Sequence, residues 1–255
     1  MERFTSDDLS LAYIDAPPNG DDRGEPILLI HGFASTHAVN WVFPHWVRAL
    51  TADGRRVIAL DNRGHGRSDK PYEVAAYHTG RMANDALGLL DHLGIRHCDV
   101  MGYSMGARIG AWLTLEHPDR VRSLVLGGLG DRLIDKSGLP DKIAEAMEAE
   151  TVDDLTDPQQ RTFRAFADAT MADRRALAAC IRGSRQALTP SQVGEIAIPV
   201  MVCVGTKDDV AGDPHTLAAM IPGARAVDIP GRDHNRAVGD KAYREAVLAF
   251  LAERP

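Results

Sequence analysis

Short apolar runs alternate with amphipathic segments from residue 26 onward, and this alternation limits the possible folds more than any other feature of the sequence. Residues 79–93 place their apolar side chains on one helical stripe, which Gly94 closes as a left-handed stop. Strands that alternate with helices favour a mostly parallel sheet with helices on its faces. The sequence therefore predicts an α/β fold, with strands expected at 26–30, 56–60, 99–103, 121–126, 200–204 and 224–229.

The alternation stops between residues 131 and 196. This segment is rich in Ala, Arg and Asp and carries only helix-start signals, which lie at Pro140, at Asp157-Pro158 and at Thr189-Pro190. We predict a core of residues 1–130 and 197–255 that is interrupted by a helical cap, 131–196. The cap is expected over the carboxyl edge of the sheet, where open α/β folds bind ligands. The residues before 16 are expected to form a leading hairpin.

Composition narrows the possible partners. The chain has 255 residues with 29 Lys and Arg against 36 Asp and Glu, a net charge of −7. It has no excess of positive charge to attract phosphates, so nucleic acid is not expected as a partner. The longest apolar stretches are about seven residues, far short of the ~20 that cross a bilayer, and no membrane partner is expected. Acidic residues stand where a signal peptide would be basic, so a cytoplasmic location is expected.

The sequence also predicts that no metal or organic cofactor is needed. Its three cysteines, Cys98, Cys180 and Cys203, are far apart and lack metal-ligand spacing, which argues against both a zinc site and a disulfide framework. It contains no glycine loop of the kind that cradles phosphates. The sequence does not indicate the oligomeric state.

The strongest chemical signal is Gly102-Tyr103-Ser104-Met105-Gly106, which joins a predicted strand to a helix-like run. A serine on such a tight turn exposes its hydroxyl above the sheet edge, and the two glycines leave room for the close crossing of strand and helix. A base must take the proton before the hydroxyl becomes a good nucleophile. His234 has the required place in the chain, in the loop after the last predicted strand.

Four motifs in order make the chain resemble the α/β-hydrolase fold family over nearly its whole length. They are His31-Gly32-Phe33-Ala34 after the first buried strand, the Asp-x-Arg-Gly-His-Gly-x-Ser turn from Asp61 to Ser68, the serine turn, and finally the paired loops 205–208 and 231–234. The resemblance implies an α/β-hydrolase fold with an inserted cap. His31 and His65 belong to these motif turns and are expected to be structural.

The resemblance also implies roles for particular residues. Ser104 would be the nucleophile and His234 the base, and the Gly-x-x-Asp spacing from Gly205 selects Asp208 as the carboxylate that orients the histidine. Asp209, its neighbour, is the alternative and is expected to be solvated. The backbone N–H groups of Phe33 and Met105 would form the oxyanion hole.

Two positions depart from the family pattern. Asp233 places a second carboxylate beside His234, where the family often has a small residue, and we expect its side chain to point to solvent. Turned inward, it would raise the proton affinity of the imidazole. Ala107 replaces a frequent glycine and should only tighten the contact of strand and helix.

These residues predict a serine hydrolase of the carboxylesterase type that cleaves small-molecule carboxylic esters through an acyl-enzyme intermediate. Ser104 argues against the aspartate-nucleophile branches, which hydrolyse epoxides and haloalkanes. An enol-lactonase, a thioesterase or a perhydrolase would use the same three residues, and a ligand receptor on the same fold is a further alternative. Turnover of an activated ester distinguishes an enzyme from a receptor.

The cap is expected to favour short acyl groups of about two to six carbons, because it carries few large apolar side chains to reward longer ones. The side chains predicted to face the pocket are Met147, Phe163, Phe166 and Met171. The opposing interpretation is that Phe163 and Phe166 form the core of the cap itself.

Overall fold

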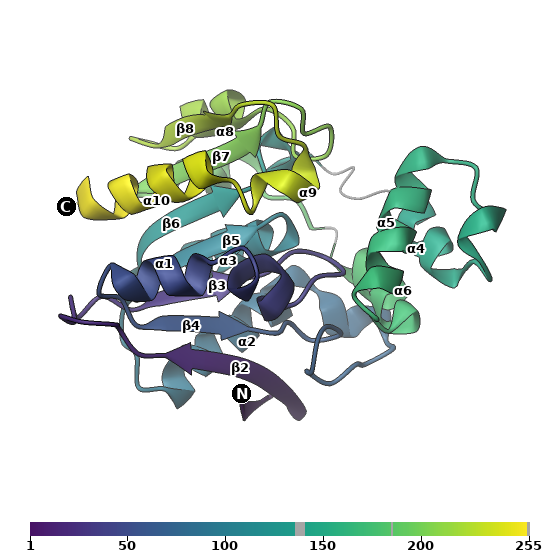
Figure 1. Ribbon diagram of the computed structural model, residues 1–255, viewed down its shortest axis with the longest axis horizontal. Helices are drawn as coiled ribbons and strands as arrows, with labels where there is room; N and C mark the ends of the chain where they lie inside the picture. The colour runs from purple at the N-terminus through teal and green to yellow at the C-terminus, as the bar shows by residue number, and fades with distance from the viewer. Residues whose placement is uncertain (136–140, 185, 254–255) are drawn as a thin grey trace.

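The computed structural model, which describes residues 1–135, 141–184 and 186–253, contains one eight-stranded sheet (Figure 1). The strand order is β1-β2-β4-β3-β5-β6-β7-β8, in which the pairs β1–β2 and β2–β4 are antiparallel and all others are parallel. The predicted mostly parallel sheet and the leading hairpin are both confirmed. The strands are β1 (Glu2–Ser6), β2 (Leu9–Ala16), β3 (Ile27–Ile30), β4 (Val57–Leu60), β5 (Cys98–Tyr103), β6 (Val121–Gly127), β7 (Val200–Gly205) and β8 (Arg225–Ile229).

Helices cover both faces of this sheet. On one face lie α1 (Trp46–Ala52) and α10 (Lys241–Glu253), and on the other lie α2 (Thr79–His92), α3 (Met105–Glu116) and α8 (Pro214–Met220) (Figure 1). Alternation along β3 divides the core in two, because Leu28 and Ile30 pack on the α2–α3 side while Ile27 and Leu29 pack on the α1–α10 side. The central strands are buried on both faces, which is why their sequences are mostly apolar.

The chain between β6 and β7 forms helices that stand beyond the carboxyl ends of the strands (Figure 1). They are α4 (Asp141–Glu148), α5 (Pro158–Ala169) and α6 (Arg174–Gly183), and we call them the cap. The fourth helix of this stretch, α7 (Pro190–Gly194), packs against α8 of the core. Asp157 caps α5 and Thr189 caps α7, at two of the predicted helix starts. The third predicted start, Pro140, lies outside the described residues.

Arg108 of α3 joins the cap to the core. Its buried guanidinium donates to the backbone oxygens of Arg132 and Leu133, where the chain enters the cap, and to that of Gln186, where the chain returns. Burial lowers the pKa of Arg108 to about 10, so the side chain stays charged near neutral pH. On the other side of the cap, the Thr170 hydroxyl donates to the Ala34 oxygen at 2.8 Å.

Five short helical turns complete the described structure: η1 (Ala38–Val42), η2 (Val74–Tyr77), η3 (Pro118–Arg120), η4 (Asp131–Leu133) and η5 (Val152–Asp154). The helix α9 (His234–Ala237) follows β8. In the described part of the chain, no helix combines the length and the apolar character that a membrane crossing requires.

The turn from Asp61 to Ser68 is built around a buried carboxylate. Asp61 accepts from the backbone N–H groups of His37 and Arg67 at 2.8 and 2.9 Å, and the Ser68 hydroxyl donates to the Asp61 backbone oxygen. Gly66 passes directly over this carboxylate with φ +51°, so that a Cβ added there would lie 2.2 Å from Asp61 Oδ2. Both the backbone angle and the lack of space require glycine.

We therefore expect Gly66→Ala to lower the free energy of unfolding by at least about 2 kcal/mol more than Gly94→Ala does. Gly94 has a similar φ of +66° but nothing within 4 Å of an added Cβ, so it isolates the cost of the backbone angle. Urea denaturation of the two variants measures the difference. Equal losses would show that the contact with Asp61 relaxes without cost.

Candidate active site

Ser104 sits between β5 and α3 in a strained backbone conformation, with φ +54° and ψ −114°. The strain persists because the surrounding backbone leaves no alternative. A Cβ at Gly102 would lie 2.2 Å from the Gly106 oxygen, and a Cβ at Gly106 would lie 2.0 Å from the Ile30 oxygen. The glycines two before and two after the serine thus permit α3 to start directly above β5 and beside β3, as the motif predicts.

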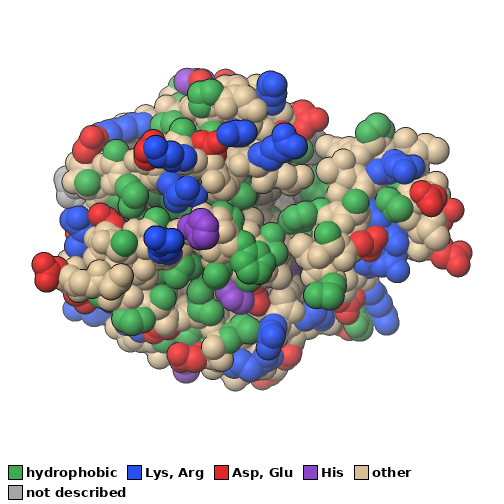
Figure 2. Space-filling view, in the orientation of Figure 1, with side chains coloured by type: hydrophobic (Ala, Val, Ile, Leu, Met, Phe, Trp, Pro, Cys, Tyr) green, Lys and Arg blue, Asp and Glu red, His purple; other side chains and the backbone are tan. Residues whose placement is uncertain are grey.

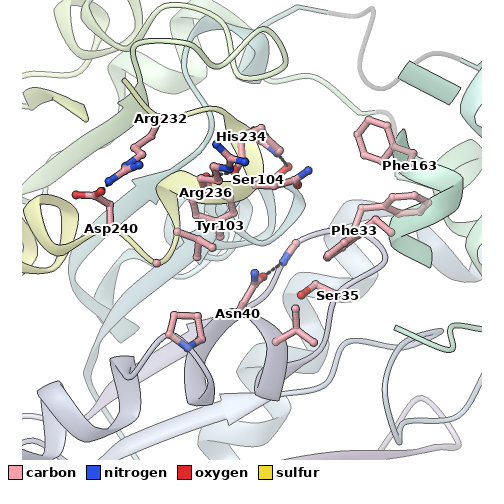
Figure 3. A pocket seen from close by; sticks show the side chains of 17 residues that line it. Phe33, Ser35, Asn40, Tyr103, Ser104, Phe163, Arg232, His234, Arg236 and Asp240 are labelled. Carbon is pink, nitrogen blue, oxygen red and sulfur yellow. Dashed lines mark hydrogen bonds and ion pairs between the residues drawn. The ribbon is translucent and has the colours of Figure 1, made fainter. Parts of the chain in front are cut away.

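A hydrogen-bonded chain runs from Ser104 through His234 to Asp208. The Ser104 Oγ lies 3.1 Å from His234 Nε2 (Figure 3). On the other side of the ring, His234 Nδ1 lies 2.7 Å from Asp208 Oδ2. The Asp208 side chain is fully buried and that of His234 is 13% exposed. Ser104 is more than 100 positions away in the sequence from both Asp208 and His234. The structure brings the three residues together because β5, β7 and β8 end at the same edge of the sheet.

The loop after β7 distinguishes Asp208 from Asp209. The second oxygen of Asp208 accepts from the backbone N–H groups of Val210 and Ala211, both at 2.9 Å, so both of its oxygens are engaged. Asp209 is exposed. Gly205 allows this loop to touch the histidine loop, because a Cβ at Gly205 would lie 2.1 Å from the Arg232 oxygen.

The histidine loop is fixed by two further contacts. Asp233 caps α9 by accepting from the Arg236 N–H at 2.9 Å, and its side chain is about half exposed, which agrees with the prediction that it points outward. The buried Tyr103 hydroxyl donates to the backbone oxygen of His234 at 2.6 Å. Burial raises the pKa of Tyr103 well above its usual value, so the hydroxyl keeps the proton that it donates.

The Phe33 and Met105 amides remain available for a ligand. Neither N–H donates to an acceptor within the described residues, and Met105 is the first residue of α3, where the helix dipole favours negative charge. The loop of Phe33 is held against Ser104, since a Cβ on Gly32 would lie 3.4 Å from the Ser104 Cβ. This arrangement can stabilise an oxyanion formed beside the Ser104 hydroxyl.

His31 and His65 are buried beneath this loop. His31 accepts from the Asn62 N–H through Nε2 at 3.0 Å, so its Nδ1 donates to the Gly32 oxygen at 2.8 Å. Burial lowers the pKa of His31 to about 4 and that of His65 to about 3. Both are therefore neutral near pH 7 and support the loop.

A cavity of about 390 Å³ opens beside Ser104 (Figure 3). Phe33, Phe163 and Phe166 form its apolar side toward the cap, with the rings of Phe33 and Phe163 6.2 Å apart. Figure 2 shows the surface hollowed between the core and the cap, with hydrophobic side chains on both sides of the hollow. Both predicted phenylalanines thus line the cavity.

The two methionines predicted beside them do not line this cavity, which corrects the sequence-based prediction. Met147 is 1% exposed and packs inside the cap against its other helices, whereas Met171 is 92% exposed at a left-handed turn after α5. Met171 lies beyond the end of its helix, and for Met147 the packing of the short cap helices on one another decides which side faces inward.

Sequence reasoning also missed several lining residues. Ser35 and Asn40 come from the segment after β3, and Arg232, Arg236 and Asp240 come from the histidine segment. Their closeness in the chain to Phe33 and His234 was the only available signal. No group of three His, Cys, Asp or Glu side chains placed to hold a metal ion occurs among the residues described.

The geometry agrees with what comparisons with known proteins find. A family model described as the alpha/beta hydrolase fold matches residues 25–155. Rhodomycin D methylesterase from Streptomyces peucetius is 30% identical over 259 residues, covering 84% of this chain and 86% of that protein. Epoxide hydrolase B from Mycobacterium tuberculosis is 37% identical over 117 residues, but the match covers 45% of this chain and only 31% of that protein's length.

Among solved structures, a hydrolase from Pseudomonas aeruginosa PA01 superimposes with a TM-score of 0.81 at 29% sequence identity. The match covers 98% of this chain and 97% of that one. The similarity therefore extends through the cap as well as the core.

The buried histidines make stability depend on pH. Since the pKa of His31 and His65 is lower in the folded protein than the ~6.5 of an unfolded chain, the unfolded state binds their protons first as the pH falls. We expect the free energy of unfolding to decrease between about pH 6.5 and 4.5, by up to about 1.4 kcal/mol per pH unit for each histidine.

Urea denaturation across this pH range measures the slope. His65→Gln should remove the contribution of one histidine to the slope, up to about 1.4 kcal/mol per pH unit. His97→Gln, which changes an exposed histidine, should leave the slope unaltered. A slope that is the same in all three proteins would contradict this explanation.

Proposed function

The chain belongs to the α/β-hydrolase fold family, and on that basis we propose that it is a serine hydrolase which cleaves carboxylic esters through an acyl-enzyme intermediate on Ser104. The observation that carries the proposal is the hydrogen-bonded chain Ser104–His234–Asp208, with two free amides beside the serine. The substrate is a small-molecule ester.

In the proposed reaction, the Ser104 Oγ attacks the ester carbonyl carbon while His234 Nε2 takes the hydroxyl proton. The carbonyl oxygen gains negative charge and is bound by the Phe33 and Met105 amides, each worth about 3 kcal/mol in the transition state. Asp208 holds the proton on Nδ1 and stabilises the imidazolium. His234 then protonates the departing alcohol, and a water molecule activated by the same imidazole releases the acid and regenerates Ser104.

The relatives favour an ester over an epoxide as the substrate. The methylesterase is similar along most of the chain, whereas the epoxide hydrolase matches less than half of it. Opening an epoxide through an alkyl-enzyme ester requires a carboxylate nucleophile, and here the corresponding position on the turn is Ser104. Lactones and thioesters present the same carbonyl chemistry and belong in the same substrate panel.

We expect Ser104→Ala to lower kcat for an activated ester at least ~10³-fold, since no nucleophile remains, and Asp208→Asn to lower it at least ~10²-fold by disturbing the histidine tautomer. Asp209→Asn is the matched control and should stay within about twofold of wild type, because Asp209 is exposed. Steady-state kinetics on p-nitrophenyl acetate gives all three values.

Labelling provides an independent readout of the same proposal. An organophosphonate should attach to Ser104 alone, as mass spectrometry would show. A label on a different serine, or slow turnover accompanied by ligand-dependent association with another protein, would replace the hydrolase proposal with another site or with the receptor alternative.

Short acyl chains should be preferred. Each methylene gains about 0.8 kcal/mol only while apolar surface is available to bury it. The cavity offers such surface mainly at its three phenylalanines, while Ser35, Asn40 and Arg232 make part of its wall polar. In a series of p-nitrophenyl esters, we expect kcat/KM to peak at about two to six acyl carbons. A value still rising at about ten carbons would indicate a lipase-like groove instead.

A further inference from the structure

One wall of the cavity carries a buried hydroxyl that the protein itself leaves without a partner. Ser35 is 3% exposed and lines the cavity, and its Oγ has no hydrogen-bond partner among the described residues. Buried hydroxyls are almost always paired, so this one requires a partner from the contents of the cavity. Figure 3 shows Ser35 on the same side of the cavity as Asn40.

Asn40 adds a second polar group to this wall. Its Oδ1 is occupied, because it accepts from the Gly32 N–H at 2.8 Å, and this contact fixes the direction of the amide (Figure 3). Asn40 is 6% exposed and lines the cavity, and its Nδ2 donates to no acceptor in the described part of the chain. The wall therefore offers an N–H donor beside a hydroxyl that can donate or accept.

Both groups lie close to the reacting centre. Ser35 N–H donates to the Gly32 oxygen at 3.3 Å and Asn40 binds the Gly32 N–H. A Cβ added to Gly32 would lie 3.4 Å from the Ser104 Cβ. The same segment carries the Phe33 amide. A substrate whose carbonyl is bound beside Phe33 must therefore pass this polar wall within a few bonds of the carbonyl carbon.

The position of His234 indicates which half of the ester meets the wall. The alcohol half must leave beside His234 Nε2, which gives it a proton. In Figure 3, Ser35 and Asn40 lie on the opposite side of Ser104 from His234, so the acid half of the ester extends toward them. This step rests on the proposed function.

We propose that the preferred substrates are esters of acids that carry a hydroxyl or oxo oxygen near the scissile carbonyl, bound by Ser35 Oγ and Asn40 Nδ2. In the free enzyme, water can satisfy both groups. A plain alkyl chain displaces that water and leaves two buried polar groups unpaired, whereas a hydroxyl or oxo group replaces its hydrogen bonds. The preference therefore arises as much from the penalty on the alkyl chain as from attraction to the oxygen.

The test compares ethyl 3-hydroxybutanoate and ethyl 3-oxobutanoate with ethyl butanoate, which have the same leaving group, in a pH-stat assay. We expect kcat/KM for each oxygenated ester to exceed that for butanoate at least ~10-fold in the wild type. Ser35→Ala should reduce this ratio at least ~10-fold for the 3-hydroxy ester. Phe166→Leu, which changes the apolar wall and keeps the hydroxyl, should alter both rates but not their ratio.

Inhibition of the wild-type enzyme by the free acids gives a second readout that needs no variant, and 3-hydroxybutanoate should bind at least ~10-fold more tightly than butanoate. Turnover of all esters with a ratio near one in wild type, or an unchanged ratio in folded Ser35→Ala, would overturn the inference and leave the ester-hydrolase proposal intact. Absence of turnover together with absence of labelling at Ser104 would overturn both.

Discussion

The arrangement of the site depends on the place where the backbones of β5, α3 and β3 cross without side chains between them. Gly102 and Gly106 bring the first turn of α3 against the end of β5 and against the Ile30 oxygen. This contact forces Ser104 into its strained conformation and, at the same time, sets the distance from the serine to the segment that follows β3. The nucleophile, the Phe33 amide and the polar wall are therefore all positioned by one packing constraint.

Several buried polar contacts then keep that segment in place. The carboxylate of Asp61 binds the His37 N–H and ring, and although burial raises its pKa, these hydrogen bonds hold the pKa well below the usual range for aspartate. His31 links Gly32 to Asn62 from beneath. Because these partners all belong to the core, most of the contacts that hold the segment after β3 come from the core, and the cap adds the Thr170 hydrogen bond to Ala34.

The strands that are buried on both faces of the sheet could be predicted from the sequence. A strand buried on both faces is mostly apolar, so β3, β5 and β7 were recognisable within one or two residues. The choice of Asp208 came from the Gly-x-x-Asp spacing that the resemblance to the α/β-hydrolase family implies. Met147 and Met171 could not be assigned, because short helices that pack mainly on each other have several compatible orientations. The role of the buried Arg108 could not be predicted either, because its partners are backbone oxygens, which leave no pattern in the sequence.

The contacts of Arg108 affect how the inserted cap can change in length. Because one guanidinium on α3 binds the chain both where it leaves the core and where it returns, the two ends of the insertion meet at a single point of the scaffold. Closing a loop whose ends are already adjacent costs entropy that grows only slowly with its length. The insertion can therefore behave as an exchangeable module, replaced by a longer or shorter one between the same two anchor points while the reacting groups below keep their geometry.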